Sequence, residues 1–224
     1  MKILYGKPLA NKILEEVKKN VAELGRTPVL SVICYEPEQP YYQGICRDAA
    51  YCGIEVINHY PIDESMDGVI SLDKGYVPGC EVNVDGGNTT PCTAEAIMEM
   101  LRYYNISVAG KNVCVIGRSE RVGRPLTCLL LDADATVTVC HSVTEEGDLY
   151  WHMVSSDIII SCAGRAGISG QHAISQYTTV IDVGNDFDSY GNANSVIPFI
   201  GGVGPVTRAV LMRHVYMKAK EKES

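Results

Sequence analysis

Residues 113–125 have the types and spacing of a loop that binds a phosphate group. They read Val-Cys-Val-Ile-Gly-Arg-Ser-Glu-Arg-Val-Gly-Arg-Pro, so an apolar strand runs into a turn led by Gly117, and a helix begins within that turn. Backbone N–H groups and the positive end of the helix then face an anion. The pattern departs from Gly-x-Gly-x-x-Gly, because Ser119 takes the second glycine position and Gly123 comes one residue late. A plain strand–turn–helix connection is the alternative.

The end of the next predicted strand, 136–140, favours NADP over NAD. An NAD site typically has Asp or Glu about 20 residues after the glycine loop, to accept a hydrogen bond from the ribose. Here His141 and Ser142 follow the strand, with no carboxylate at its tip. We expect Arg118, His141 and Ser142 to surround a 2′-phosphate, with the guanidinium supplying charge and a forked donor. The alternative for His141 is a loop histidine without a ligand.

The elements that must position this loop alternate between strands and helices, which favours a parallel sheet. Strands are predicted near 113–116, 136–140, 157–162 and 179–183. Ligands of open α/β sheets bind at the carboxyl ends of the strands, so glycines just past two of these ends are expected beside the cofactor. Simple turns are the alternative there. The predicted cofactor contacts are Gly117, Arg118, Ser119, Val122, Gly123, His141, Ser142, Gly164 and Gly184.

The first part of the chain also alternates between predicted helices and strands, up to a region rich in turn-forming residues at 63–91. Apolar residues at helical spacing predict a helix over 9–24, and apolar runs predict strands at 29–35 and 54–57 around a helix over 41–52. Residues 63–91 contain Asp-Gly, Lys-Gly and Pro-Gly pairs, which predict loops. A further helix is expected to begin at Thr93, and the last helix to follow Pro205.

Composition narrows the class of protein. The formal net charge of -8 argues against nucleic acid as a partner. The sequence contains no run of about 18 apolar residues, so no membrane span is predicted. The start of the chain lacks the apolar core of a signal peptide. Nine cysteines, an odd number with no Cys-x-x-Cys pair, indicate reduced buried thiols rather than a disulfide scaffold or a metal site. We therefore expect a cytoplasmic protein without a metal.

Several segments, in this order along the chain, resemble the methylenetetrahydrofolate dehydrogenase/methenyltetrahydrofolate cyclohydrolase family, called FolD in bacteria. Pro91-Cys92-Thr93 is similar to the family's Pro-Cys-Thr at the start of a helix. The glycine loop and the strand that follows it also match. The closing segment Gly-Gly-Val-Gly-Pro-Val-Thr resembles the family's Gly-Gly-Val-Gly-Pro-Met-Thr. The matching segments are 91–93, 117–125, 135–144, 181–184 and 201–207.

The resemblance implies an α/β fold with a Rossmann-like nucleotide domain over 93–205. A shortened α/β catalytic domain would comprise 1–92 together with the C-terminal helix 206–224, and a folate would lie between the two. The implied activity is NADP-dependent oxidation of 5,10-methylenetetrahydrofolate to the methenyl form, and family members are commonly homodimers. The residues implied to contact a tetrahydrofolate derivative are Tyr41, Asp85, Gly201, Gly202, Pro205 and Thr207.

The chain departs from the family at the catalytic motif Tyr-x-x-x-Lys. Alignment on Gly53-Ile54 places the tyrosine at Tyr41 and the lysine at Ile45. A shift by one residue gives Tyr42 and Cys46 instead, and Arg47 lies about 200° around the helix from Ile45. The family lysine handles protons in the hydrolysis step, so the resemblance leaves cyclohydrolase activity in doubt. Tyr41 and Asp85 remain as the implied catalytic residues.

A second departure is the absence of the family's Gln-Leu-Pro-Leu-Pro segment. Residues 67–72 resemble a remnant of the strand before it, and at least one helix is missing. Asp85, in Asn-Val-Asp-Gly, matches the family's folate-contacting aspartate, although a turn aspartate is the alternative. Lys74 lies in the shortened region and either replaces the missing lysine or belongs to an ordinary turn.

Three functions fit these features. The first is a working dehydrogenase, with or without hydrolysis of the methenyl product to 10-formyltetrahydrofolate. The second is a dinucleotide-binding relative with another substrate, and the third is a non-enzymatic protein that kept the nucleotide domain. Hydride transfer depends mainly on a well-placed donor and acceptor, so it can survive the loss of a proton-handling lysine. We therefore favour the dehydrogenase.

Overall fold

The computed structural model describes residues 1–34, 36–58, 73–77, 80–83, 90–168 and 174–221. The chain divides into two compact units, taken in turn below. Unit 1 comprises Met1–Lys7 and Thr93–Gly204, and unit 2 comprises Pro8–Cys92 and Pro205–Ser224. The first seven residues therefore belong to the same unit as residues 93–204, rather than to the unit that contains the residues directly after them. Among the described helices, none has the length and apolar character needed to cross a membrane.

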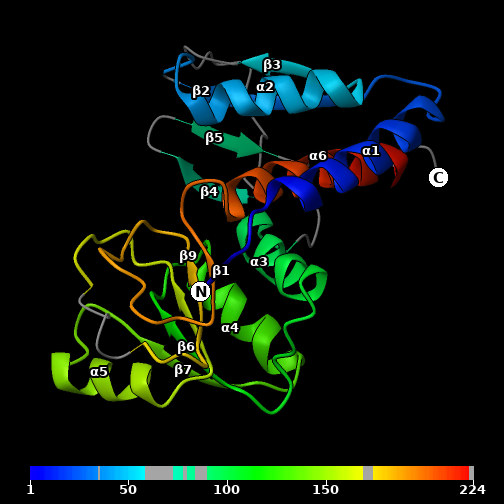
Figure 1. Cartoon of the computed structure of the whole chain (residues 1–224). Coiled ribbons are helices and arrows are strands. Elements are labelled where there is room, and N and C mark those ends of the chain that lie inside the picture. Colours follow the sequence, from blue (N-terminus) through cyan, green and yellow to red (C-terminus); the bar gives the residue numbers. More distant parts are fainter. Residues whose placement is uncertain (35, 59–72, 78–79, 84–89, 169–173, 222–224) are drawn as a thin grey trace. The chain divides into compact units, whose positions relative to one another are not determined.

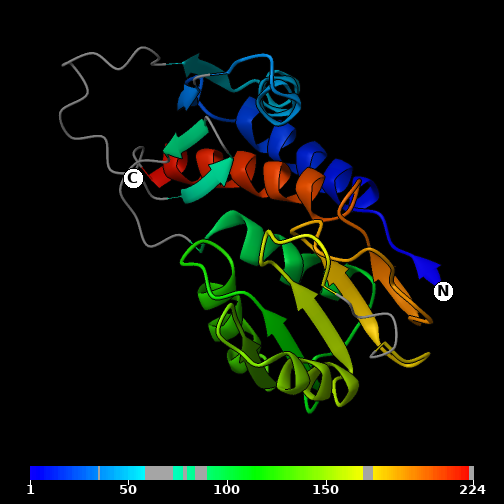
Figure 2. The ribbon, with the colours of Figure 1, turned by 90° about the vertical axis from the view of Figure 1, so that its left-hand side faces the viewer.

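Unit 1 contains a six-stranded sheet in which every pair of neighbouring strands is parallel. The strand order is β1-β10-β9-β8-β6-β7. The arrows of the central strands point the same way in Figure 2. The strands are β1 (Lys2–Ile3), β6 (Asn112–Ile116), β7 (Thr136–Cys140), β8 (Ile158–Ser161), β9 (Thr179–Asp182) and β10 (Ser195–Ile197).

The four strands predicted for this sheet are confirmed to within one residue at each end. Their interiors are apolar because helices and loops cover both faces, and Cys114, Ile159 and Val180 contribute to one buried cluster. The sequence did not predict β1 and β10, whose two and three residues are too few to show a period. The helices of this unit are α3 (Cys92–Tyr103), α4 (Gly123–Asp132) and α5 (Glu146–Val154).

Unit 2 has a smaller, mixed sheet in the order β3-β2-β5-β4, with long helices beside it (Figure 1). β2 and β3 are parallel, whereas β5 is antiparallel to both β2 and β4. Figure 1 shows α1 and α6 side by side, although they come from opposite ends of the chain. The elements are α1 (Lys7–Ala22), β2 (Val29–Cys34), α2 (Pro40–Cys52), β3 (Glu55–Asn58), β4 (Asp73–Val77), β5 (Cys80–Asn83) and α6 (Val203–Glu221).

The expectation that 63–91 consists of loops is wrong for β4 and β5. Gly75 lies inside β4, where the register shifts between Asp73 and Val77. A glycine in a strand is typical of such an irregularity, so the Lys-Gly pair marked a bend within a strand rather than a loop. The predicted Asp67–Leu72 remnant lies outside the described residues. The predicted α/β class is confirmed.

A buried carboxylate fixes the loop that follows β8. Asp186 accepts hydrogen bonds from the Ser161 hydroxyl at 2.6 Å and from the backbone N–H groups of Ala163 and Arg165 at 2.9 and 2.6 Å. The Asp186 N–H in turn donates to Asp182 at the end of β9. Because unpaired polar groups in such a buried position are expensive, this network ties the loops after β8 and β9 to one another.

Candidate functional site

The carboxyl ends of the central strands of unit 1 meet at one edge of the sheet. Ile116 of β6 pairs with Cys140 of β7 and with Ser161 of β8. Ser161 also pairs with Asp182 of β9. β6 lies between β7 and β8, so the chain leaves β6 toward one neighbour and returns to β8 on the other side. Such a switch point is where open α/β sheets bind their ligands.

Gly117 begins the loop after β6 in a conformation that only glycine adopts easily. Its φ is 122°, and a Cβ atom there would lie 2.7 Å from the carbonyl oxygen of Cys162. A Cβ atom on Gly123 would overlap the carbonyl oxygen of Gly117. The loop is thus pressed against the end of β8 and against the first turn of α4. Residues 117 and 123 must therefore be glycine, whereas binding of a phosphate by this loop stays a prediction.

The remaining loop residues turn the chain into α4. The Val122 N–H donates to the Ser119 hydroxyl at 3.2 Å, and the Arg124 N–H donates to the Ser119 carbonyl at 3.0 Å. Val122 is the N-cap of α4 and makes no side-chain capping hydrogen bond. The first turn of α4 has no acidic residue, and Arg118 is exposed beside it. The start of α4 therefore keeps the positive character that an anion requires.

The loop after β7 holds the predicted histidine in a defined turn. The His141 N–H donates to the Thr144 hydroxyl at 2.9 Å, and the Thr144 N–H donates to the His141 carbonyl at 2.9 Å. The same hydroxyl lies 3.4 Å from Nδ1 of the imidazole. Ser142 is exposed at the tip. Because β7 neighbours β6, His141 and Ser142 follow the strand adjacent to the glycine loop.

Gly164 and Gly184 also follow strands at this edge. Gly164 has a φ of 63° and comes two residues after Cys162, whose carbonyl oxygen faces Gly117. A Cβ atom on Gly184 would overlap the carboxylate of Asp186, which holds the β8 loop. The fold thus brings the loops that carry the predicted cofactor residues to one edge. Their contact with a cofactor stays a prediction.

Cys162 places a neutral thiol behind the glycine loop. Its Sγ would lie 3.0 Å from a Cβ atom on Gly117. Burial, and then the nearby Asp186 carboxylate, raises the pKa of Cys162 to about 12. At neutral pH the thiol is therefore protonated, and it adds no negative charge beside a bound phosphate.

Unit 2 contains the predicted catalytic tyrosine. Tyr41 lies in the first turn of α2 and is partly buried, whereas Ile45, at the family's lysine position, is 0% exposed. Arg47 is exposed on another side of the helix. The guanidinium carbon of Arg208, from α6, lies 5.8 Å from the centre of the Tyr41 ring. The tyrosine thus has beside it a cation from a helix distant in the sequence.

Arg208 and its partner Asp48 were not predicted from the sequence. The Arg208 Nε donates to an Asp48 carboxylate oxygen at 2.7 Å. Asp48 lies on the buried side of α2 with Ile45, Ala49 and Cys52. A carboxylate on an apolar helix face requires a cation from elsewhere in the chain. The position of Asp48 was therefore the one sequence feature that could have indicated a buried ion pair.

The other predicted substrate residues lie in two places. Gly201 has a φ of 76°, and its carbonyl accepts from the Gly6 N–H at 2.8 Å. A Cβ atom on Gly202 would overlap the Pro198 carbonyl oxygen. Pro205 and Thr207 lie in the first two turns of α6, where Thr207 is buried. Asp85 lies outside the described residues, and Lys74 is part of β4.

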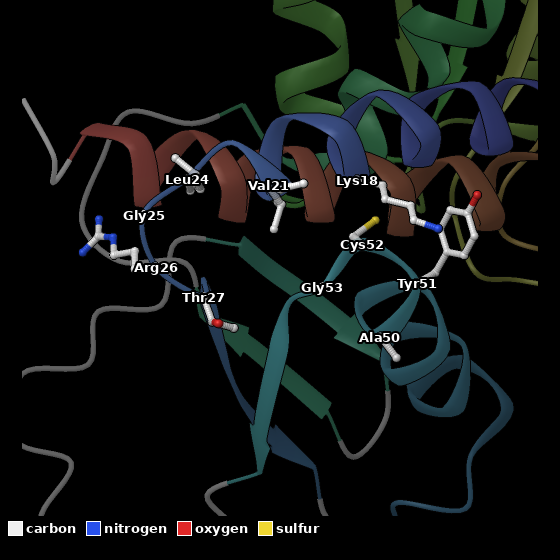
Figure 3. Close-up of a pocket in the computed structure, with 11 residues that line it drawn as sticks. Lys18, Val21, Leu24, Gly25, Arg26, Thr27, Ala50, Tyr51, Cys52 and Gly53 are labelled. Atoms are coloured by element: carbon white, nitrogen blue, oxygen red, sulfur yellow. The ribbon is translucent and has the colours of Figure 1, made fainter.

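An open hollow of about 690 Å³ on unit 2 lies where α1 and α2 end (Figure 3). Figure 3 shows the Lys18 amine over the Tyr51 ring, 4.2 Å from the ring centre. Burial, followed by the charge of Asp48, raises the pKa of the Cys52 thiol in this hollow to about 12. The thiol is protonated at neutral pH and the amine rests on a tyrosine, so the hollow offers no activated nucleophile.

Comparison with known proteins agrees with this geometry. Residues 91–223 match the family described as tetrahydrofolate dehydrogenase/cyclohydrolase, NAD(P)-binding domain. The bifunctional protein FolD of Arthrobacter globiformis is 32% identical, over 98% of this chain and 95% of its own length. The corresponding protein of Methanoculleus marisnigri is 33% identical, over 97% and 96%. The chain belongs to the tetrahydrofolate dehydrogenase/cyclohydrolase family.

Solved structures of the family extend the match to the whole fold. A 5,10-methylenetetrahydrofolate dehydrogenase from the silkworm, Bombyx mori, superposes with a TM-score of 0.83 at 27% identity, covering 100% of this chain and 99% of that one. The Trypanosoma brucei dehydrogenase–cyclohydrolase, solved with NADP and an inhibitor, gives 0.83 at 27% identity, covering 99% and 98%.

The chain is shorter than its family relatives. Its alignment with the Arthrobacter protein spans 280 positions, whereas the chain has 224 residues, so at least 56 residues of the relative have no counterpart here. This agrees with the loss of the Gln-Leu-Pro-Leu-Pro segment and of a helix that the sequence indicated. The span that matches the family model, 91–223, contains the glycine loop.

We predict that Gly117→Ala weakens binding of the dinucleotide at least tenfold. The added Cβ meets the Cys162 carbonyl in a backbone region that disfavours side chains, at a cost of about 1–3 kcal/mol, so the loop must move. Titration calorimetry with NADP checks this. Gly147→Ala on α5 is the matched control, because no atom lies within 4 Å of its added Cβ. Wild-type affinity in Gly117→Ala would rule out this loop as the cofactor site.

Proposed function

We propose that the protein is an NADP-dependent 5,10-methylenetetrahydrofolate dehydrogenase. The observation that carries the proposal is the Gly117 loop, a tight glycine turn at the switch point of a parallel sheet, in a chain of this family. Relatives over nearly the full length are named bifunctional FolD proteins, and one similar structure holds NADP. Alone, neither the loop nor the family specifies the reaction, but together they support hydride transfer to NADP.

The described residues fit a phosphorylated dinucleotide. The close approaches at Gly117 and Gly123 hold the loop against the end of β8 and the first turn of α4, and the start of α4 favours negative charge. Arg118 is exposed, and no acidic residue stands at the tip of β7, where NAD sites bind the ribose. Arg118, His141 and Ser142 would hold the 2′-phosphate, and NADP⁺, when bound, supplies the acceptor for the hydride.

The folate is assigned to Tyr41, Asp85, Gly201, Gly202, Pro205 and Thr207. Tyr41 supports this assignment because its ring lies beside a cation and remains partly accessible. In the oxidation, the methylene carbon loses a hydride and the product is the methenyl cation. No proton is exchanged in that step, so these side chains need only bind and orient the substrate.

Hydrolysis of the methenyl group places different demands on the site. Water must attack, and a proton must leave, which a positioned acid or base accelerates by about 10²–10⁴-fold. Ile45 is fully buried hydrocarbon at the position of the family's lysine, and Arg47 is exposed on another side of α2. We therefore propose that the chain oxidises methylenetetrahydrofolate without hydrolysing the product.

Two further expectations belong to this proposal. Assembly as a homodimer is supported by the family resemblance. A cytoplasmic location is supported by the thiols, since eight of the nine cysteines are free in the part of the chain whose side chains are described. A related binding protein with another substrate is the second candidate function, favoured by the loss of the lysine and of at least 56 residues.

We predict that NADP binds more tightly than NAD and that Arg118→Ala removes the difference. A charged, forked contact with a phosphate contributes roughly 1.5–3 kcal/mol, so the substitution should weaken NADP binding at least tenfold and leave NAD binding unchanged. Calorimetric titration of both cofactors measures this. Arg102→Ala, on the exposed side of α3, is the matched control. Equal affinities for both cofactors, unaffected by Arg118→Ala, would refute the 2′-phosphate assignment.

We predict that the wild-type protein does not hydrolyse 5,10-methenyltetrahydrofolate above the spontaneous rate. The decay of the methenyl absorbance, with and without purified protein, gives the measurement. Ile45→Lys alone should not restore hydrolysis, because the new amine would enter a fully buried position and lose its charge. Turnover near that of an ordinary family member would show that another residue transfers the proton, and Lys74 would be the first candidate.

A further inference from the structure

A largely buried ion pair, between Arg208 and Asp48, joins α2 to α6 within unit 2. The Nε of Arg208 lies 2.7 Å from Oδ2 of Asp48, and the two side chains are only 15% and 12% exposed. Ion pairs at protein surfaces are weak and variable, but a pair this far from water remains in place because each charge needs the other. The guanidinium of Arg208 is therefore held in one position.

Gly44 makes room for this guanidinium. A Cβ atom on Gly44 would lie 2.7 Å from the Arg208 Nε and 2.9 Å from its Cζ, so any side chain there would displace the group. Gly44 lies in the interior of α2, where glycine is an unfavourable residue. α2 thus combines a mid-helix glycine, Gly44, with a buried acid, Asp48, and both residues fix the position of the Arg208 guanidinium.

The seated guanidinium lies on the face of α2 that carries Tyr41. Tyr41, Gly44 and Asp48 are spaced three and four residues apart, so they share one side of the helix. The Arg208 Cζ lies 5.8 Å from the Tyr41 ring centre, within the range of a cation–π contact. Among the described residues, Asp48 is the only hydrogen-bond acceptor of the guanidinium, and it uses Nε.

We propose that Arg208 is a positioning residue of the folate site, where it supplies the cation beside Tyr41 that Ile45 cannot supply. Asp48 and Gly44 fix its guanidinium, which orients the Tyr41 ring and attracts the polar oxygens of the bound folate. This inference rests on the proposed dehydrogenase function. It names the group that keeps the substrate site charged in a chain without the family's lysine.

The chemistry of arginine explains which activity such a site retains. A guanidinium stays protonated at every pH that a protein tolerates, so it contributes charge and hydrogen-bond donors but accepts no proton. Binding and orientation, which hydride transfer requires, are therefore supported. Arginine does not, however, provide a general base for the attacking water. The replacement of a titratable amine by a permanent cation accounts for oxidation without hydrolysis.

The test compares Arg208→Met, Arg208→Lys and the double variant Arg208→Met/Asp48→Asn, with exposed Lys220→Met as control. NADPH formation from 5,10-methylenetetrahydrofolate gives kcat and KM, calorimetry gives the NADP affinity, and thermal unfolding gives Tm. We expect Arg208→Met to raise the folate KM at least tenfold with NADP affinity unchanged. Arg208→Lys should recover part of this loss, and Lys220→Met should behave as wild type.

The double variant separates a role at the site from a role in folding. Neither charge is left alone in it, so its Tm should exceed that of Arg208→Met while its folate KM stays high. A wild-type KM in the double variant, or a KM in Arg208→Lys as high as that in Arg208→Met, would overturn the role of Arg208. Absence of NADPH formation by the wild-type protein would instead contradict the proposed function itself.

Discussion

The approach of the Gly117 backbone to the carbonyl oxygen of Cys162 is the constraint on which the nucleotide site depends. At 2.7 Å from the position of a Cβ atom, that oxygen excludes every side chain from residue 117. The loop after β6 can therefore lie against the end of β8, and α4 can begin close to the strand. Asp186 supports the arrangement from the other side, because it holds Ala163 and Arg165 in the loop after β8. The Gly117 backbone thus packs against the end of β8 with no side chain between them.

Unit 2 follows a different principle, since its candidate site depends on side chains from two distant segments. Arg208 reaches Asp48 across 160 residues of sequence, and the pair lies beside the partly buried Tyr41. Ile45 makes the neighbouring position dry and uncharged. The proposed retention of oxidation and loss of hydrolysis follow from this, because a fixed cation can hold a substrate but cannot exchange protons with it. A chain that lost its lysine could thereby keep one half of a bifunctional reaction.

The sequence predicted the elements with strong local signals. The four strands near 113–183 were found because each is an apolar run with turn residues at its ends, and the glycine loop was recognised from its spacing. β4 was missed, because Gly75 signals a turn in isolation and becomes a strand irregularity only when β5 pairs with it. Arg208 was missed for a similar reason. Nothing near it in the chain shows that Asp48 lies opposite, and only the packing of α6 on α2 makes them partners.

The balance of products tests most directly whether the protein oxidises its substrate without hydrolysing the product. Purified protein is incubated with NADP⁺ and 5,10-methylenetetrahydrofolate, and NADPH, methenyltetrahydrofolate and 10-formyltetrahydrofolate are quantified over time. We predict that NADPH and methenyltetrahydrofolate form in equal amounts and that 10-formyltetrahydrofolate forms only at the spontaneous rate. Formation of 10-formyltetrahydrofolate as fast as NADPH, or no NADPH at all, would contradict it.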